Sequence, residues 1–158
     1  MKSNLITKSE TNALLKIISE QWGIEFPKMK NLKVHQISDD AQIITGGGFK
    51  ILKVGQDYLP FLSETEILKK FPNIMVDMGA VKFMCKGANA MRPGIKKYTK
   101  FEKNQIVCII EESQQKFLAV GKAMMSSSEL ENTSKGEVIK NLHYISDNFW
   151  ETGKTIYD

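Results

Sequence analysis

The sequence has no long hydrophobic run. Its longest apolar stretch is Ile106–Ile110, far shorter than the about 20 residues needed to cross a bilayer. The opening residues, MKSNLITKSE, lack the apolar segment and the small-residue cleavage pattern of a secretory signal. We therefore expect a cytoplasmic protein that makes no membrane contact.

Residues that bind metals or form cross-links are also scarce. The chain has two cysteines, Cys85 and Cys108, which lie far apart, and only two histidines. Neither a C-x-x-C pair nor the ligand spacing of a zinc site is present. We expect two free thiols, no metal and no cofactor.

Motifs for catalysis are missing as well. The sequence contains neither G-x-S-x-G nor H-E-x-x-H. Asn141 and His143 alternate in a predicted strand, and without a neighbouring nucleophile or carboxylate motif we expect His143 to be a polar strand residue or an RNA contact. The prediction is that this protein is not an enzyme.

Positive charge is abundant, and it is concentrated in one window. The 22 Lys and Arg residues outnumber the 18 Asp and Glu residues, giving a net charge of +4. Residues 82–103 carry seven cations and one acid, a net +6, so the rest of the chain sums to −2. The seven cations are Lys82, Lys86, Arg92, Lys96, Lys97, Lys100 and Lys103. Such clustering is typical of a surface that meets phosphates, and Arg92, the only arginine, could grip a phosphate with its planar fork.

The first half of the chain predicts a small α+β unit. Thr7 and Glu10 have capping-box spacing, and apolar residues then recur at helical intervals until Gly23. Alternating segments predict an antiparallel meander with strands at 32–37, 41–45, 49–54 and 58–62. Ser63–Phe71 predicts a second helix, with Ser63 as its N-cap.

Three successive glycines, Gly46–Gly48, could suggest a phosphate-binding loop. Such a loop lies between a strand and a helix N-terminus, whereas here a strand follows. Glycines also supply the positive φ angles that tight hairpins need. We interpret these glycines as a hairpin turn.

The second half begins with a strand and a short helix. Asn73–Val76 predicts the strand, Asp77 can cap a helix over Gly79–Lys86, and Gly87 can end that helix in a left-handed conformation. Three residues of this helix are expected in the core: Ala80, Phe83 and Met84.

A series of short strands follows this helix. Ala88–Met91 is expected to be extended, and Pro93–Gly94 suits the centre of a type II turn. Apolar segments predict strands at 105–110, 117–125, 135–142 and 143–145. Gly121 inside a strand indicates a bulge or a close backbone approach. We expect Trp150 to close one end of a small β-barrel, followed by a frayed tail.

Four segments of the second half carry a family resemblance: VDMGAVKFMCKGANAMRPGI, FEKNQIVCII, LAVGKAMMSS and KGEVIKNLHYISDNFW. Their order and spacing resemble a PUA domain, and the last segment is similar to the end of that domain in the malignant T-cell amplified sequence and translation-machinery-associated family. The resemblance implies an α+β pre-PUA domain over 1–72, then a mainly β pseudo-barrel, the PUA domain, with one inserted helix over 73–153. Residues 154–158 form a C-terminal tail.

The resemblance also implies a function. Members are non-enzymatic RNA-binding proteins of translation, so we expect contact with small-subunit ribosomal RNA or a tRNA end during initiation, reinitiation or recycling. The small ribosomal subunit and a density-regulated-type translation factor are the implied partners. We predict RNA contacts at Lys82, Lys86, Gly87, Ala88, Met91, Arg92, Pro93, Gly94, Lys96, Lys97, Asn141 and His143.

Two other functions stay open. PUA domains are often appended to RNA-modifying enzymes, so the protein could be the RNA-targeting subunit of a base-modifying enzyme. The first half could instead serve as a protein-interaction module, which an exposed apolar patch on residues 1–72 would favour.

Overall fold

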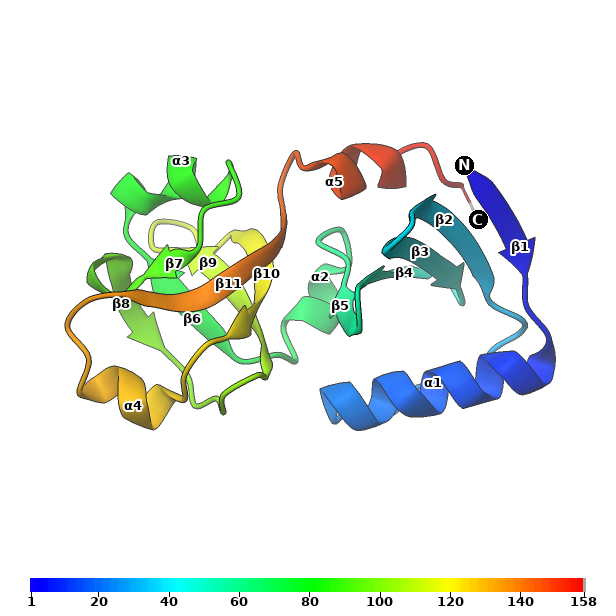
Figure 1. Ribbon diagram of the computed structural model, residues 1–158, viewed down its shortest axis with the longest axis horizontal. Coiled ribbons are helices and arrows are strands. Elements are labelled where there is room, and N and C mark those ends of the chain that lie inside the picture. The colour runs from blue at the N-terminus through cyan, green and yellow to red at the C-terminus, as the bar shows by residue number, and fades with distance from the viewer. Residues whose placement is uncertain (158) are drawn as a thin grey trace.

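Short strands pair into two sheets in the computed structural model, which describes residues 1–157 (Figure 1). The first sheet is an antiparallel meander in the order β1-β2-β3-β4-β5. Its strands are β1 (Lys2–Leu5), β2 (Lys33–Ser38), β3 (Ala41–Gly46), β4 (Phe49–Val54) and β5 (Asp57–Pro60). The predicted meander is therefore confirmed, with one addition: the exposed edge strand β1, which we did not predict because only Leu5 and Ile6 of the first seven residues are branched apolar residues.

Helix α1 (Lys8–Trp22) covers one face of this sheet. Its predicted capping box forms, because the Thr7 side chain accepts from the Glu10 amide and the Glu10 carboxylate accepts from the Thr7 amide, both at 3.1 Å. The helix ends at Gly23 in the left-handed conformation. The Trp22 indole N–H donates to the Tyr58 carbonyl at 2.8 Å, which fixes the end of the helix against β5. No helix within residues 1–157 has the length and apolar content to span a membrane.

The second sheet forms a nearly closed barrel whose two edge strands follow one another in the chain. Its order is β7-β11-β10-β9-β6-β8, and only the 3-10 turn η2 (Arg92–Gly94) separates β7 from β8. Strands β6 and β9 are parallel and all other pairs are antiparallel. The strands are β6 (Asn73–Val76), β7 (Ala90–Met91), β8 (Ile95–Tyr98), β9 (Ile106–Glu111), β10 (Phe117–Ala123) and β11 (Glu137–Tyr144). The predicted pseudo-barrel is confirmed.

The helices of the barrel are short. A 3-10 turn, η1 (Met78–Ala80), leads into α3 (Val81–Met84), and α4 (Ser127–Glu131) lies between β10 and β11.

The linking helix α2 (Thr65–Leu68) is shorter than predicted and starts after Glu64 with no side-chain cap. The predicted cap at Ser63 is therefore wrong. The Glu64 carboxylate instead accepts from the Lys50 amide at 2.9 Å, so it joins α2 to β4.

Two buried clusters form the core, one inside the barrel and a larger one that extends from the first half to the barrel strands β9 and β10. Neighbours in a strand point to opposite faces, yet Ile43 and Ile44 are both fully buried, so both faces of the first sheet are covered. Figure 1 shows α1 on one side and the final helix, α5 (Asn148–Gly153), on the other. Barrel residues Cys108 and Val120 pack in the same buried cluster as Phe61. The two halves therefore form one packed unit.

A buried histidine connects the halves through hydrogen bonds. The Leu62 amide donates to Nε2 of His143 at 3.1 Å, so the other ring nitrogen carries the proton and donates to the Asp147 carboxylate at 2.8 Å. Asp147 also accepts from the Trp150 amide and so caps α5. The Phe61 ring lies 4.7 Å from the His143 ring, centroid to centroid. We call these contacts the inter-half latch.

The chain after β11 packs on the first half, and this corrects two predictions. Trp150 stacks with Phe61, at 6.2 Å between centroids and 7° between planes, and so does not close the barrel end. Ile156 is 6% exposed within the core of the first half, so the tail is not frayed at that position. The last helix therefore returns across the first half rather than belonging to the barrel.

Two turn predictions have opposite outcomes. Gly47 and Gly48 have φ angles of 59° and 83° at the β3–β4 turn, which confirms the hairpin interpretation. The Pro93–Gly94 turn is not type II, because the segment is a 3-10 turn and the φ of Gly94 is not positive.

Gly121 should tolerate no side chain. It lies at a register shift in the β10–β11 pairing, where a Cβ atom would collide with the carbonyl oxygen of Lys140. We expect Gly121→Ala to lower the free energy of unfolding by about 1–3 kcal/mol, the usual cost of overpacking. Denaturant titration measures this loss. Gly79→Ala is the matched control, because a Cβ there meets only ordinary contacts; equal stability of the two variants would contradict the assignment.

Glu111 should make the stability of the fold depend on pH in the acid range. Its carboxylate accepts from the Ser113 hydroxyl and from the amides of Lys116, Gln114 and Ser113, and these bonds lower its pKa to about 2. The stabilisation is complete above the unfolded-state pKa of about 4.3 and is lost as the pH falls towards 2. Glu111→Gln should therefore lower the melting temperature at pH 7 and flatten its decline between about pH 4 and 2. Parallel wild-type and variant melting curves across that range would contradict this role.

Candidate nucleic-acid interface

A groove of about 440 Å³ lies beside the short helix of the barrel. Its walls come from η1 and α3 on one side and from β7 and the start of β11 on the other. The lining residues are Val76, Asp77, Gly79, Ala80, Phe83, Met84, Ala88, Asn89, Met91, Gly94 and Glu137. The groove brings together three of the predicted contact residues, Ala88, Met91 and Gly94.

Local sequence sets the entrance to the helix. Asp77 caps the 3-10 turn, as predicted, by accepting from the Ala80 amide at 2.9 Å. After α3 the chain turns at Gly87, whose φ of 91° is left-handed, as predicted. A Cβ at Gly87 would lie 2.9 Å from Cε1 of Tyr144, so both the backbone angle and the space favour glycine here.

Asn141 holds the loop between α3 and β7. Its side-chain amide donates to the carbonyls of Met84 at 3.1 Å and Ala88 at 3.0 Å, while its backbone amide donates to Asn89 at 2.9 Å. These bonds shape the groove wall from behind. The structure therefore gives Asn141 a positioning role, and its amide nitrogen is already engaged by the protein.

Exposed apolar side chains mark the mouth of the groove. Phe83 is 52% exposed and Met91 is 47% exposed, and both line the groove. The prediction that Phe83 lies in the core is wrong, while Met84 is buried as expected. A helix of four residues offers too few positions to establish which face is apolar, so the sequence pattern could not separate these two side chains.

The acidic groups inside the groove were not predicted. Asp77 and Glu137 both line it, and the Asn89 side-chain amide donates to the Glu137 carboxylate. No signal in the sequence joins Glu137 to residues about 50 positions earlier. Carboxylates disfavour a phosphate inside the groove and instead offer acceptors to amino groups.

The cations lie around the groove rather than in it. Lys82 and Lys86 are exposed on and just after α3, and the Lys82 ammonium lies 5.2 Å from the centroid of the Phe83 ring. Lys96 and Lys97 are exposed on the edge strand β8 and do not line the groove. As neighbours in a strand they point to opposite faces. The charge window is therefore spread over more than one surface.

The guanidinium group of Arg92 is not fully free to bind a ligand. Its side chain is half-buried, Nε donates to the Thr133 carbonyl at 2.9 Å and a terminal nitrogen donates to the Ile95 carbonyl at 3.3 Å. The guanidinium carbon also lies 5.9 Å from the centroid of the Tyr98 ring. These contacts join the η2 turn to the chain after α4, which corrects the expectation of an open phosphate clamp.

His143 is the clearest correction among the predicted contact residues. Its side chain is fully buried in the inter-half latch, so it is inaccessible to RNA. Its alternation with Asn141 in β11 was read correctly from the sequence. The partner of its Nε2 atom, Leu62, lies 81 residues earlier, and no local pattern reveals such a contact.

Neither thiol is poised for chemistry. Burial raises the pKa of Cys85 and strongly raises that of Cys108, so both are held in the neutral form. No group of three or more His, Cys, Asp or Glu side chains that could hold a metal occurs among residues 1–157.

Arg92 and Lys86 should differ in their effect on stability. Arg92→Ala leaves the carbonyls of Thr133 and Ile95 without donors, so we expect it to cost about 1–3 kcal/mol of unfolding free energy. Lys86→Ala removes an exposed cation for which no ion pair occurs within residues 1–157, so stability should stay unchanged within about 0.5 kcal/mol. Thermal unfolding of both variants tests the contrast. Equal melting temperatures would mean that the Arg92 contacts stabilise nothing.

Known proteins resemble this chain both in the barrel alone and over its full length. A family model for the PUA domain matches residues 72–145, the barrel. Among solved structures, a protein from Pyrococcus horikoshii has a TM-score of 0.79 and 24% identity, and a conserved PUA domain protein from Thermoplasma acidophilum has 0.75 and 23%. Each match covers 96% of this chain and 99% of the other. A chain of an H/ACA ribonucleoprotein bound to a substrate RNA matches 60% of this chain, over 29% of its own length, with a TM-score of 0.50 and 24% identity.

Curated relatives match along most of the chain. A Methanocaldococcus jannaschii protein is 31% identical, over 86% of this chain and 85% of its own. Malignant T-cell-amplified sequence 1-A of Xenopus laevis is 34% identical over 83% of this chain and 77% of its own, and translation machinery-associated protein 20 of Schizosaccharomyces pombe is 35% identical over 80% and 74%. These matches extend through both halves, so the chain belongs to the malignant T-cell-amplified sequence and translation machinery-associated family of PUA-domain proteins.

Proposed function

We propose that this protein is a non-enzymatic RNA-binding factor of translation that holds an unpaired RNA segment in the groove beside α3. The observation that carries the proposal is the pairing of an apolar groove mouth with exposed lysines on and just after α3. The family's names place relatives with the translation machinery, and small-subunit ribosomal RNA or a tRNA end is the RNA we propose.

The groove suits a base and its ribose better than a phosphate. Unpaired bases are commonly held by stacking on exposed aromatic side chains, and Phe83 offers such a ring at the mouth. Asp77 and Glu137 offer acceptors for base amino groups or ribose hydroxyls. The carboxylates would keep phosphates out of the interior.

Phosphates would then lie along the rim. Lys82 and Lys86 are the exposed cations nearest in sequence to Phe83, and the backbone at Gly87–Ala88 has no large side chain to block a close approach. Across η2, exposed Pro93 and whichever of Lys96 and Lys97 points to the same face of β8 offer a second contact region. In this arrangement phosphate contacts supply affinity, while the groove selects an unpaired nucleotide.

The proposed setting is the cytoplasm, on the small ribosomal subunit, with a density-regulated-type factor as a protein partner. The alternative is an RNA-targeting subunit of a base-modifying enzyme, for which the partial likeness to the H/ACA ribonucleoprotein chain is the supporting observation. That likeness covers 60% of this chain, whereas the family match covers 83% of it and so extends through both halves. Affinity purification from cells separates the two functions, because the first should recover small ribosomal subunits and the second a catalytic subunit.

Groove variants should lose RNA affinity without losing stability. The probe is a fluorescein-labelled single-stranded RNA of about 12 nucleotides with a free 3′ end, and fluorescence anisotropy measures its affinity at several salt concentrations. Phe83→Ala should weaken binding about tenfold, the usual value of one base stacked on an aromatic ring. Lys82→Ala with Lys86→Ala should weaken it at low salt and reduce the salt slope by about 1–1.5.

The control replaces two exposed lysines that lie away from the groove, Lys16→Ala with Lys116→Ala. This pair removes as much positive charge as the Lys82→Ala and Lys86→Ala pair does. It therefore separates the loss of a local RNA contact from a general weakening of electrostatic attraction. RNA binding that is unchanged in the groove variants, or reduced equally in the control, would show that another surface holds the RNA.

A further inference from the structure

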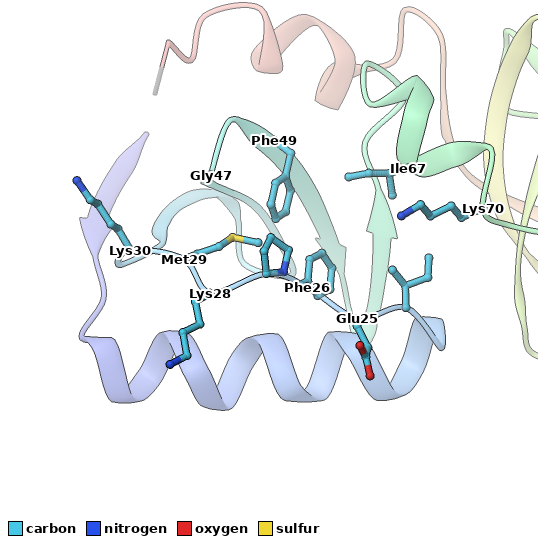
Figure 2. A pocket seen from close by; sticks show the side chains of 11 residues that line it. Glu25, Phe26, Lys28, Met29, Lys30, Gly47, Phe49, Ile67 and Lys70 are labelled. Atoms are coloured by element: carbon cyan, nitrogen blue, oxygen red, sulfur yellow. The ribbon is translucent and has the colours of Figure 1, made fainter.

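The first half contains a pocket that RNA binding by the barrel groove does not use. It has a volume of about 470 Å³ and lies between the loop after α1, the β3–β4 hairpin and the end of α2 (Figure 2). Its lining residues are Ile24, Glu25, Phe26, Pro27, Lys28, Met29, Lys30, Gly47, Phe49, Ile67 and Lys70. None of them lines the barrel groove.

Apolar side chains form the floor of this pocket and are tied to the core. Phe26 stacks on Phe49, with 5.6 Å between centroids and 16° between planes, and also packs against the buried Trp22 at 5.6 Å. Met29 and Ile67 complete the floor and are half-buried, like the two phenylalanines. A floor anchored in this way is preformed, so a ligand would not need to order it on binding.

Three lysines line the pocket that contains this apolar floor. Lys70, just after α2, extends its side chain toward the floor in Figure 2, whereas Lys28 and Lys30 lie on the loop and extend away from the floor at the rim. All three are exposed, and none forms an ion pair within residues 1–157. Glu25 is the one acid at the pocket, and in Figure 2 its carboxylate points away from the floor, toward α1.

The basic surface continues beyond the pocket. A neighbouring depression shares Lys28, Met29 and Lys30 and extends to Lys8 and to Leu5, which is 67% exposed. The two adjoining depressions share these three residues and so form one continuous surface. An extended chain with alternating apolar and anionic groups matches its apolar and cationic groups.

We propose that this surface docks an acidic segment of a partner protein, which inserts one large apolar side chain onto the Phe26–Phe49 floor. Carboxylates flanking that side chain would meet Lys28, Lys30 and Lys70. The floor suits a large apolar side chain, because the side chains that form it are all apolar; single-stranded RNA is the competing occupant, and the experiment below separates the two. A large apolar anchor with a charged surround is the usual arrangement of a peptide-binding hot spot.

Selection from a phage-displayed library of random 12-residue peptides tests the proposal on the full-length protein. We expect enriched peptides to share one aromatic or large aliphatic residue with at least two acidic residues close by. Lys28→Glu with Lys70→Glu should weaken an enriched peptide by about tenfold or more, because opposite charges become like charges. Lys16→Glu with Lys116→Glu is the matched control, since both lysines are exposed, neither lines the pocket, and the pair changes the net charge by the same amount.

Each other outcome overturns the proposal. No enrichment, a consensus without acidic residues, or equal effects of the pocket and control variants would show that no acidic segment docks here. Displacement of the enriched peptide by a single-stranded RNA of the same length would assign the surface to RNA instead. The Phe83→Ala variant should bind the peptide like the wild-type protein. A negative result for peptide docking therefore leaves the proposed RNA binding by the groove unaffected.

Discussion

The contact between Leu62 and the buried His143 sets the relation of the two halves, and the rest of the structure depends on it. The imidazole accepts from a backbone amide of the first half and donates to Asp147, which in turn caps the helix that returns across that half. An unpaired buried amide or imidazole would be costly, so each of the three groups requires the other two. The barrel groove and the basic pocket are consequently held at a fixed separation on one packed body. A protein built in this way can engage two ligands at once in a defined geometry.

Local chemistry was predictable from the sequence, and long-range contacts were not. The caps at Thr7 and Asp77 and the close approach at Gly121 each depend on residues nearby in the chain or on sterics that favour one amino acid, and all three were anticipated correctly. The order of the segments identified the family and the barrel. The internal contacts of Arg92 and the burial of His143 were not predicted, because their partners lie about 40 and 81 residues away. Charge density along the sequence indicated a binding surface but not how its lysines are distributed in space.

The interior of the barrel groove differs from the phosphate cradle that the charge window suggested. Carboxylates of Asp77 and Glu137 lie where a purely electrostatic surface would place lysines, and the cations lie at the rim. Affinity and selectivity would therefore come from different groups: phosphates held by exposed lysines, and one unpaired nucleotide accommodated by Phe83 and the acceptors behind it. The single arginine joins the turn between the barrel edges to the chain after α4 through its hydrogen bond to Thr133, so it helps to hold that turn in place.

Ultraviolet crosslinking of RNA to the protein in cells tests most directly whether the groove beside α3 holds an unpaired RNA segment. Sequencing identifies the crosslinked RNA, and mass spectrometry of the digested protein identifies the crosslinked peptide. We predict small-subunit ribosomal RNA or a tRNA end attached to a peptide from residues 78–91. Crosslinks confined to the first half, or to the face of the barrel that carries α4, would contradict the assignment of the groove.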